Sequence, residues 1–266
     1  SVGEIAKALM SSDSAVAQRL VRAKETLRSS GARFEMPEGA DLRSRLQTIL
    51  KALYLLFNEG YVAHSGDALT KDDLCDEAII LTSRLVETTP GNTPATHALL
   101  ALMLLHSARM PSRIDESGAL QLLEEQDRTK WDRSRISSGL FHLAQASTGD
   151  RLTPYHCEAA IAAAHCMSPS FDETDWVLVL SHYDDLMRVS PSPLARLNRA
   201  VAVWQVRGVE DALEELETLS PALDSYYLLH ATRGRISGQP EHYAKALALT
   251  RNEAERRFIA KHQAGT

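Results

Sequence analysis

The chain has 266 residues, of which 44% are hydrophobic and 24% are charged, and its net charge is −6 at pH 7. This composition is that of a globular protein and excludes an intrinsically disordered one. The longest unbroken apolar run, Ala98 to Leu105, has eight residues, whereas a membrane span needs about 20, so the sequence predicts no membrane contact.

Charge is distributed unevenly along the chain. Residues 1–34 carry a net charge of +3, and the remainder carries −9. A basic N-terminal segment on an otherwise acidic chain indicates that only residues 1–34 contact a polyanion. The alternative is that so small an excess arises by chance.

The whole chain has the periodicity of helices. Apolar residues recur at three- and four-residue spacing, and no long stretch alternates with period two, so the sequence predicts an all-α protein. Proline, glycine and serine clusters separate the predicted helices. Helices are expected at residues 4–10, 14–30, 41–59, 71–88, 94–109, 131–147, 154–167, 173–189, 193–207, 209–219, 223–236 and 241–262.

The first two predicted helices have the pattern of a helix-turn-helix, with the turn at residues 10–12. In the second helix, one face is apolar and should lie against a core. Its members are Val16, Leu20, Ala23 and Leu27. The opposite face and its flank carry side chains that read base edges or hold phosphates, and the second helix of such a motif lies in the major groove. The candidate DNA-binding residues are Ser14, Gln18, Arg19 and Arg22. The alternative is an ordinary amphipathic hairpin with an exposed basic face.

Breakers gather at residues 31–40, where Gly31, Pro37 and Gly39 lie close together. We therefore predict a domain boundary there. The expected organisation is a helix-turn-helix remnant at 1–34, a linker at 35–40 and a second domain at 41–266.

The second domain contains a weak internal repeat of helix, short turn, helix and proline. Leu197 and Ala200 align with Leu228 and Ala231, a period of 31 residues. This pattern resembles the tetratricopeptide (TPR) repeat of about 34 residues. The sequence thus predicts a TPR-like stack of helical hairpins, with an irregular helical bundle as the alternative.

Residues 113–132 interrupt the helical pattern. A turn signal at 116–118 lies between Ile114 and Leu120 and predicts either a short hairpin or an ordered loop. Charged residues follow. They suit a ligand pocket or a contact with a partner, or else a solvated helix face or an ion network that braces a loop, which His106 and Arg109 could join. The candidate interaction residues are Arg113, Asp115, Glu124, Glu125, Asp127, Arg128 and Trp131.

Motifs for catalysis, cofactors and metals are absent from the sequence. There is no nucleophile motif, phosphate-binding glycine loop or dinucleotide fingerprint, so we expect neither an enzyme nor a bound cofactor. The stretch HCEAAIAAAHC holds two histidines nine residues apart, and two cysteines likewise. On one helix such pairs lie on opposite sides and cannot converge on zinc, so we expect no metal site. An odd number of cysteines without paired spacing fits a reducing cytoplasm.

Long strings of the chain resemble one protein family. The opening EIAKALMSSDSAVAQRLVRAKETLRSSGARFEMP is similar to the end of region 4 of extracytoplasmic-function (ECF) sigma factors. The strings ALYLLFNEGY, LCDEAIILTSRLV, ALLALMLLHSAR, LLEEQDRTKWDR, PSPLARLNRAVAV and NEAERRF resemble the large, TPR-like C-terminal extension of one ECF group. The resemblance covers essentially the whole chain.

The resemblance implies a role in transcription initiation. In that family, region 4 binds the −35 promoter element and the RNA polymerase core, and the extension would regulate the factor through another protein or through the sigma core. Region 2 and the front of region 4 have no counterpart here, so the chain is expected to be a C-terminal part of a longer sigma factor. The alternative function is a TPR-like scaffold that binds a peptide or protein and has no DNA role.

Overall fold

The computed structural model is built from helices joined by turns and loops, and it confirms the all-α fold class. Within the described part of the chain, the one β feature is an isolated antiparallel bridge between Ile114 and Leu120. The chain divides into two compact units, Ser1–Asn92 and Thr93–Thr266. The structure describes residues 2–8, 11–31, 39–62, 72–115, 120–250 and 253–263.

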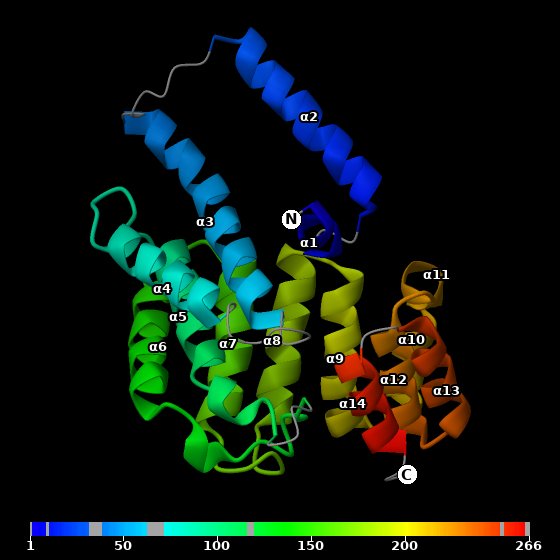
Figure 1. Cartoon of the computed structure of the whole chain (residues 1–266). Coiled ribbons are helices and arrows are strands. Elements are labelled where there is room, and N and C mark those ends of the chain that lie inside the picture. The colour runs from blue at the N-terminus through cyan, green and yellow to red at the C-terminus, as the bar shows by residue number, and fades with distance from the viewer. Residues whose placement is uncertain are drawn as a thin grey trace. The chain divides into compact units, whose positions relative to one another are not determined.

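The first unit is organised around two packed helices, α3 and α4 (Figure 1). Its helices are α1 (Val2–Ala8), α2 (Asp13–Ser29), α3 (Gly39–Val62) and α4 (Asp72–Val86). Leu50, Phe57 and Ala78 are fully buried between them, and the buried Cys75 thiol donates to the carbonyl of Phe57 at 3.5 Å. Apolar residues at helical spacing on both helices form this core.

Helix α2 departs from the prediction about its apolar face. Val16 is buried, as expected, but Leu20 and Leu27 are 37% and 63% exposed, and Ala23 is exposed too. The prediction was wrong for these three because α1, the helix that packs against α2, has only seven residues and cannot cover the length of α2.

The predicted boundary at 31–40 falls mainly on residues 32–38, which lie outside the described residues. The last two residues of the predicted linker, Gly39 and Ala40, open α3. A division into two compact units comes after Asn92. That residues 1–34 fold apart from the rest stays a prediction.

The second unit contains the remaining helices, green to red in Figure 1. They are α5 (Pro94–Ser107), η2 (Met110–Ser112), η3 (Arg128–Lys130), α6 (Arg133–Ala146), α7 (Pro154–Met167), α8 (Trp176–Val189), α9 (Pro193–Arg207), α10 (Val209–Glu217), α11 (Ser220–Leu223), α12 (Tyr227–Ser237), α13 (Pro240–Leu249) and α14 (Glu253–Gln263). Among the described helices, none is long and apolar enough to cross a bilayer.

Helices of the second unit pack on their neighbours and on the next helix but one. Helix α5 contacts α6 and α7, and α12 contacts α10, α13 and α14, which is how stacked helical hairpins bury a continuous core. Leu197 and Ala200 of α9 are buried, as is Ala231 of α12, and Ala200 and Ala212 lie where α9 and α10 pack. The small residues of the predicted repeat therefore occupy its helix interfaces.

An ion network joins three consecutive helices of this stack. Arg199 of α9 donates to Asp184 of α8 at 2.7 Å and to Glu215 of α10 at 2.6 Å, and its side chain is only 19% exposed. Two carboxylate partners hold the pKa of Arg199 above its usual range, although burial lowers it. The guanidinium therefore stays charged and cross-links α8 and α10.

The predicted helix at 241–262 is two helices, α13 and α14. Thr250 is extended, and its hydroxyl donates to Glu255. The Arg256 guanidinium donates to the carbonyls of Leu247 (2.8 Å) and Thr250 (3.2 Å). These side chains satisfy carbonyls that a continuous helix would have bonded internally, so the break is stable without glycine or proline.

Candidate functional site

The predicted DNA-reading side chains all lie on α2, and all are exposed. The Ser12 hydroxyl begins this helix by accepting from the N–H of Ala15 at 3.3 Å. Ser14, Gln18 and Arg22 then follow at four-residue spacing and so share one side of the helix, while Arg19 flanks them. The structure therefore presents the predicted residues together on a solvent-facing helix that follows a shorter packed helix, α1.

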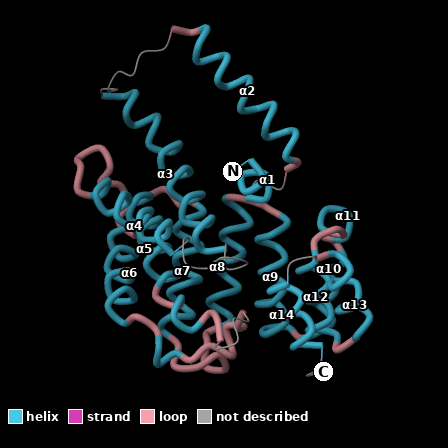
Figure 2. Tube along the Cα trace, viewed as in Figure 1, coloured by secondary structure: helices cyan, strands magenta, loops and turns pink. Residues whose placement is uncertain are grey.

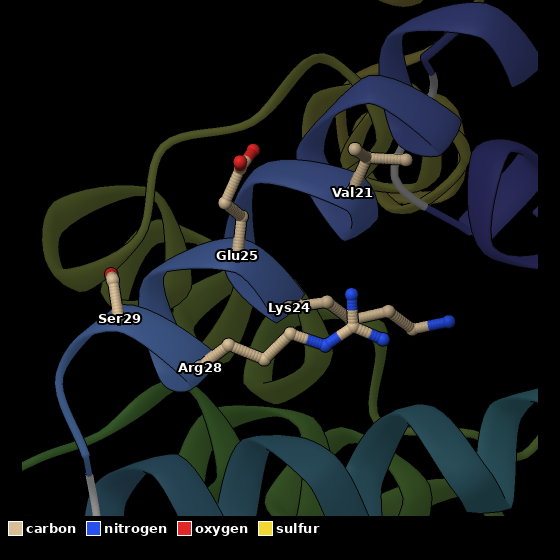
Figure 3. Close-up of a pocket in the computed structure, with 5 residues that line it drawn as sticks. All are labelled: Val21, Lys24, Glu25, Arg28 and Ser29. Carbon is tan, nitrogen blue, oxygen red and sulfur yellow. The ribbon is translucent and has the colours of Figure 1, made fainter.

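A shallow hollow runs beside the same helix. Figure 3 shows Lys24 and Arg28 extending to one side of α2, while the Glu25 carboxylate points away from them. The hollow is lined by Val21, Lys24, Glu25, Arg28 and Ser29. All five belong to one helix, so this is open surface and not an enclosed small-molecule site. An exposed helix of this kind suits a groove in its partner.

The second candidate site, residues 113–132, is mostly loop (Figure 2). The bridge between Ile114 and Leu120 holds its start together, and the predicted turn at 116–118 lies outside the described residues. The N–H of Gln121 donates to the carbonyl of Arg113 at 2.8 Å, and the Gln121 amide donates to Asp115 at 2.7 Å. The described part of the segment is thus an ordered loop with a single bridge.

Two glutamates of this segment bind helices far along the chain. Glu124 pairs with Arg235 of α12 at 2.6 Å. Glu125 pairs with Lys261 of α14 at 2.8 Å and lies 3.4 Å from His262. Burial raises the pKa of Glu125, but hydrogen bonds from Lys261 and the N–H of Leu122 outweigh it, so the pKa lies below its ordinary value. Both glutamates therefore brace the segment against the C-terminal helices.

Asp127 makes its contacts within its own segment. Its carboxylate accepts from the N–H of Thr129 at 2.9 Å and begins η3. Hydrogen bonds from Thr129 hold the pKa of the exposed Asp127 carboxyl below its usual range. Unlike Glu124 and Glu125, this charge contacts no distant helix among the described residues.

Arg128 and Trp131 fasten the end of the segment. One terminal nitrogen of Arg128 donates to the carbonyls of His165 (2.6 Å) and Ser168 (2.7 Å), at the C-terminal end of α7, where a cation is favourable. Trp131 is 3% exposed, and its indole N–H donates to the Ser112 hydroxyl at 2.7 Å. The contacts of this segment with α7, α12 and α14 favour the bracing interpretation of its charges.

The histidines and cysteines of α7 point to different partners. The His156 ring contacts the Thr153 hydroxyl at 2.7 Å, and the Cys166 thiol donates to the carbonyl of Leu105 at 3.6 Å. Burial raises the pKa of Cys157 to about 11, so its thiol is protonated at neutral pH. Across the described residues, no group of three or more His, Cys, Asp and Glu side chains could hold a metal ion.

Changing Glu125 to Gln should lower the free energy of unfolding by about 1 kcal/mol, because it removes a partly shielded ion pair with Lys261. A double-mutant cycle with Lys261→Gln, measured by urea unfolding, should show coupling that weakens at high salt. Glu214→Gln, at an exposed position of α10, is the matched control. Zero coupling would mean that the pair does not hold α14 to the segment.

Comparisons with known proteins found similarity to one family model and to one curated protein. Residues 45–147 match a protein family described as "Family of unknown function (DUF6596)". An uncharacterized protein of Rhizobium meliloti (strain 1021) is 39% identical over 266 residues, an alignment that covers 97% of this chain and 63% of the relative. The chain therefore spans less than two thirds of the length of that relative. No solved structure matches the chain.

Proposed function

We propose that this chain is the C-terminal part of an ECF-type RNA polymerase sigma factor. In this proposal, α2 reads the −35 promoter element and the helical units that follow regulate transcription initiation. The observation that carries the proposal is the exposure of Ser14, Gln18, Arg19 and Arg22 on α2, which packs with α1 as a helix pair. Gln and Arg are side chains that read base edges, and Ser and Arg hold phosphates. The resemblance of the opening string to sigma region 4 agrees with this role.

The partners follow from the proposal. They are promoter DNA and the RNA polymerase core, both of which place the protein in the cytoplasm. The stacked hairpins of the second unit would contact a regulatory protein or the sigma core, because such stacks make extended binding surfaces. Within the segment 113–132, Glu124, Glu125 and Arg128 already hold intramolecular contacts, which leaves the exposed Asp127 as the member best placed for such a partner.

The decisive measurement is promoter binding by the longest protein that the reading frame encodes. Arg22→Ala should weaken binding to all sequences and reduce its salt dependence by about one counterion, and Gln18→Ala should relax preference at one base pair. Arg207→Ala, an exposed arginine at the end of α9, is the control and should bind as the unmodified protein does. The 266-residue chain alone should bind DNA weakly, since its body is acidic.

The alternative is a helical scaffold that binds a peptide and has no DNA role. Glu25 favours it, because this carboxylate lies one turn beyond Val21 on the side of α2 proposed to face DNA, where phosphates would repel it. Under this alternative, the longest protein would show no sequence-specific DNA binding, and Arg22→Ala would behave like Arg207→Ala. That result would refute the sigma-factor proposal.

A further inference from the structure

Two arginine side chains flank one buried tryptophan in the second unit. The guanidinium of Arg128 lies 4.6 Å from the Trp131 ring centroid, and that of Arg109 lies 5.8 Å from it. Arg109 follows α5 and is only 9% exposed. Cation–π contact stabilises each charge in part. It also brings two like charges close together in the interior, where they repel each other.

Neither arginine has a carboxylate partner among the residues that the structure describes. The side chain of Arg109 makes one hydrogen bond there, from Nε to the Gln126 amide oxygen at 3.5 Å, which is long for such a bond. Arg128 uses Nη1 for the two carbonyls of α7, and its Nη2 is buried without a partner.

The acidic side chains of the same segment make their described contacts elsewhere. Glu124 and Glu125 pair with α12 and α14, and Asp127 caps η3. The described ion pair of Asp132 is with Arg135, at 3.6 Å. The segment thus brings acids and arginines together in sequence but separates them in space. Among the described residues, no carboxylate balances the positive charge around Trp131.

A second nitrogen in this region is also unsatisfied. His165 of α7 is 8% exposed, and its Nδ1 is buried without a hydrogen-bond partner. Burial lowers the pKa of His165 to about 3, and the charges of Arg109 and Arg128 contribute to the shift. The His165 carbonyl accepts from Arg128 at 2.6 Å, so this residue lies beside that guanidinium. Its ring is neutral at physiological pH and can donate one N–H.

Buried charges without a counter-ion are costly, and proteins normally pair them. Guanidinium groups match planar or tetrahedral oxyanions, which accept several charge-assisted hydrogen bonds at once. We propose that Arg109 and Arg128, which flank Trp131, form together with His165 of α7 a binding site for a small oxyanion, either phosphate or a carboxylate group. Trp131, Arg109 and His165 are nearly enclosed, so the ligand is small. The half-buried Arg128 leaves a route from solvent. The site is independent of any role of α2 in DNA binding.

The test uses the chain as it stands. Thermal unfolding and calorimetric titration at pH 7 should show stabilisation and saturable binding with sodium phosphate or sodium acetate into the tens of millimolar. Sodium chloride at matched ionic strength should not reproduce the effect. The more effective anion identifies the ligand group. Arg109→Gln should weaken binding tenfold or more, whereas Arg207→Gln should not change it.

A second readout uses the unmodified protein, so it does not depend on whether a variant folds. Bound anion should raise the pKa of His165, which NMR detects as a shift of its imidazole signals toward the protonated form at mildly acidic pH. Three results would each overturn the proposal. These are no stabilisation beyond that of chloride, equal stabilisation of the Arg109→Gln protein, and His165 signals that do not respond to a saturating anion.

Discussion

Lowering the pH from 7 to 5 should cost the protein about 2 kcal/mol of its free energy of unfolding from His165 alone. The pKa of His165 is about 3 in the folded chain and about 6.5 in an unfolded one. Between these values the unfolded state binds more protons than the folded state. The contribution of His165 to stability is therefore fully present above pH 6.5 and is lost as the pH falls toward 3. The pH of 5 lies about 1.5 units below the pKa of the unfolded state, and each unit corresponds to about 1.36 kcal/mol.

Protonation of other buried or half-buried histidines should also destabilise the folded protein at acidic pH. Burial lowers the pKa of each of them, and for His106 nearby arginines lower it further. They are His97, His106, His142, His156, His182 and His230. His97 and His142 also share a contact between their Nδ1 atoms at 2.8 Å, and protonation of both rings would break it. We therefore expect the total loss of free energy of unfolding between pH 7 and pH 5 to exceed the part that comes from His165.

Urea unfolding at pH 7, 6 and 5 measures this effect. All three tryptophans, Trp131, Trp176 and Trp204, lie in the second unit, so their fluorescence reports the unit that holds these histidines. His165→Gln should remove about 2 kcal/mol of the pH dependence, and His242→Gln on α13 is the matched control. If stability at pH 5 equals that at pH 7, His165 is not held neutral in the folded protein.

The predicted helices were most accurate where capping signals mark their ends. Helices α7 and α9 have the predicted bounds, because Thr153 and Ser192 begin them and a proline occupies each first turn. Prediction failed where side chains end a helix without a breaker, as Arg256 does between α13 and α14. It failed again on α2, where periodicity gives an apolar face but not the length of the helix that covers it.

The candidate site could be predicted only in part. Its members 113–131 are near one another in sequence, and the charged run with Trp131 inside it was visible. Their partners were not, because Glu124 binds a side chain 111 residues away and nothing local marks Arg235 or Lys261. His165 is buried in α7, and nothing in the sequence links it to the charged segment. Its proximity to Arg128 follows only from the fold, as does the finding that no described carboxylate pairs with Arg109 or Arg128.

Changing Gly91 to Ala should be among the most damaging single methyl additions to this chain. Gly91 lies in the turn after α4, and a Cβ there would lie 2.1 Å from the carbonyl oxygen of Leu85 and 2.6 Å from the Thr88 hydroxyl. That carbonyl already accepts from the N–H and hydroxyl of Thr88 at 3.1 and 2.8 Å, and the N–H of Gly91 donates to the carbonyl of Thr88 at 3.1 Å. The obstacle is backbone that is fixed by hydrogen bonds.

The turn must open to admit the methyl group. Overpacking costs about 1–3 kcal/mol, and each broken hydrogen bond adds about 1 kcal/mol, so we expect a loss of about 3 kcal/mol and a Tm lower by roughly 6–12 °C. Gly3→Ala makes the same chemical change in α1, where the new Cβ meets only the Asp13 carboxylate at 3.6 Å. That control should be neutral or slightly stabilising, because alanine favours a helix over glycine. Equal melting temperatures for the two variants would show that the turn between Leu85 and Gly91 adapts without cost, and that glycine is not required there.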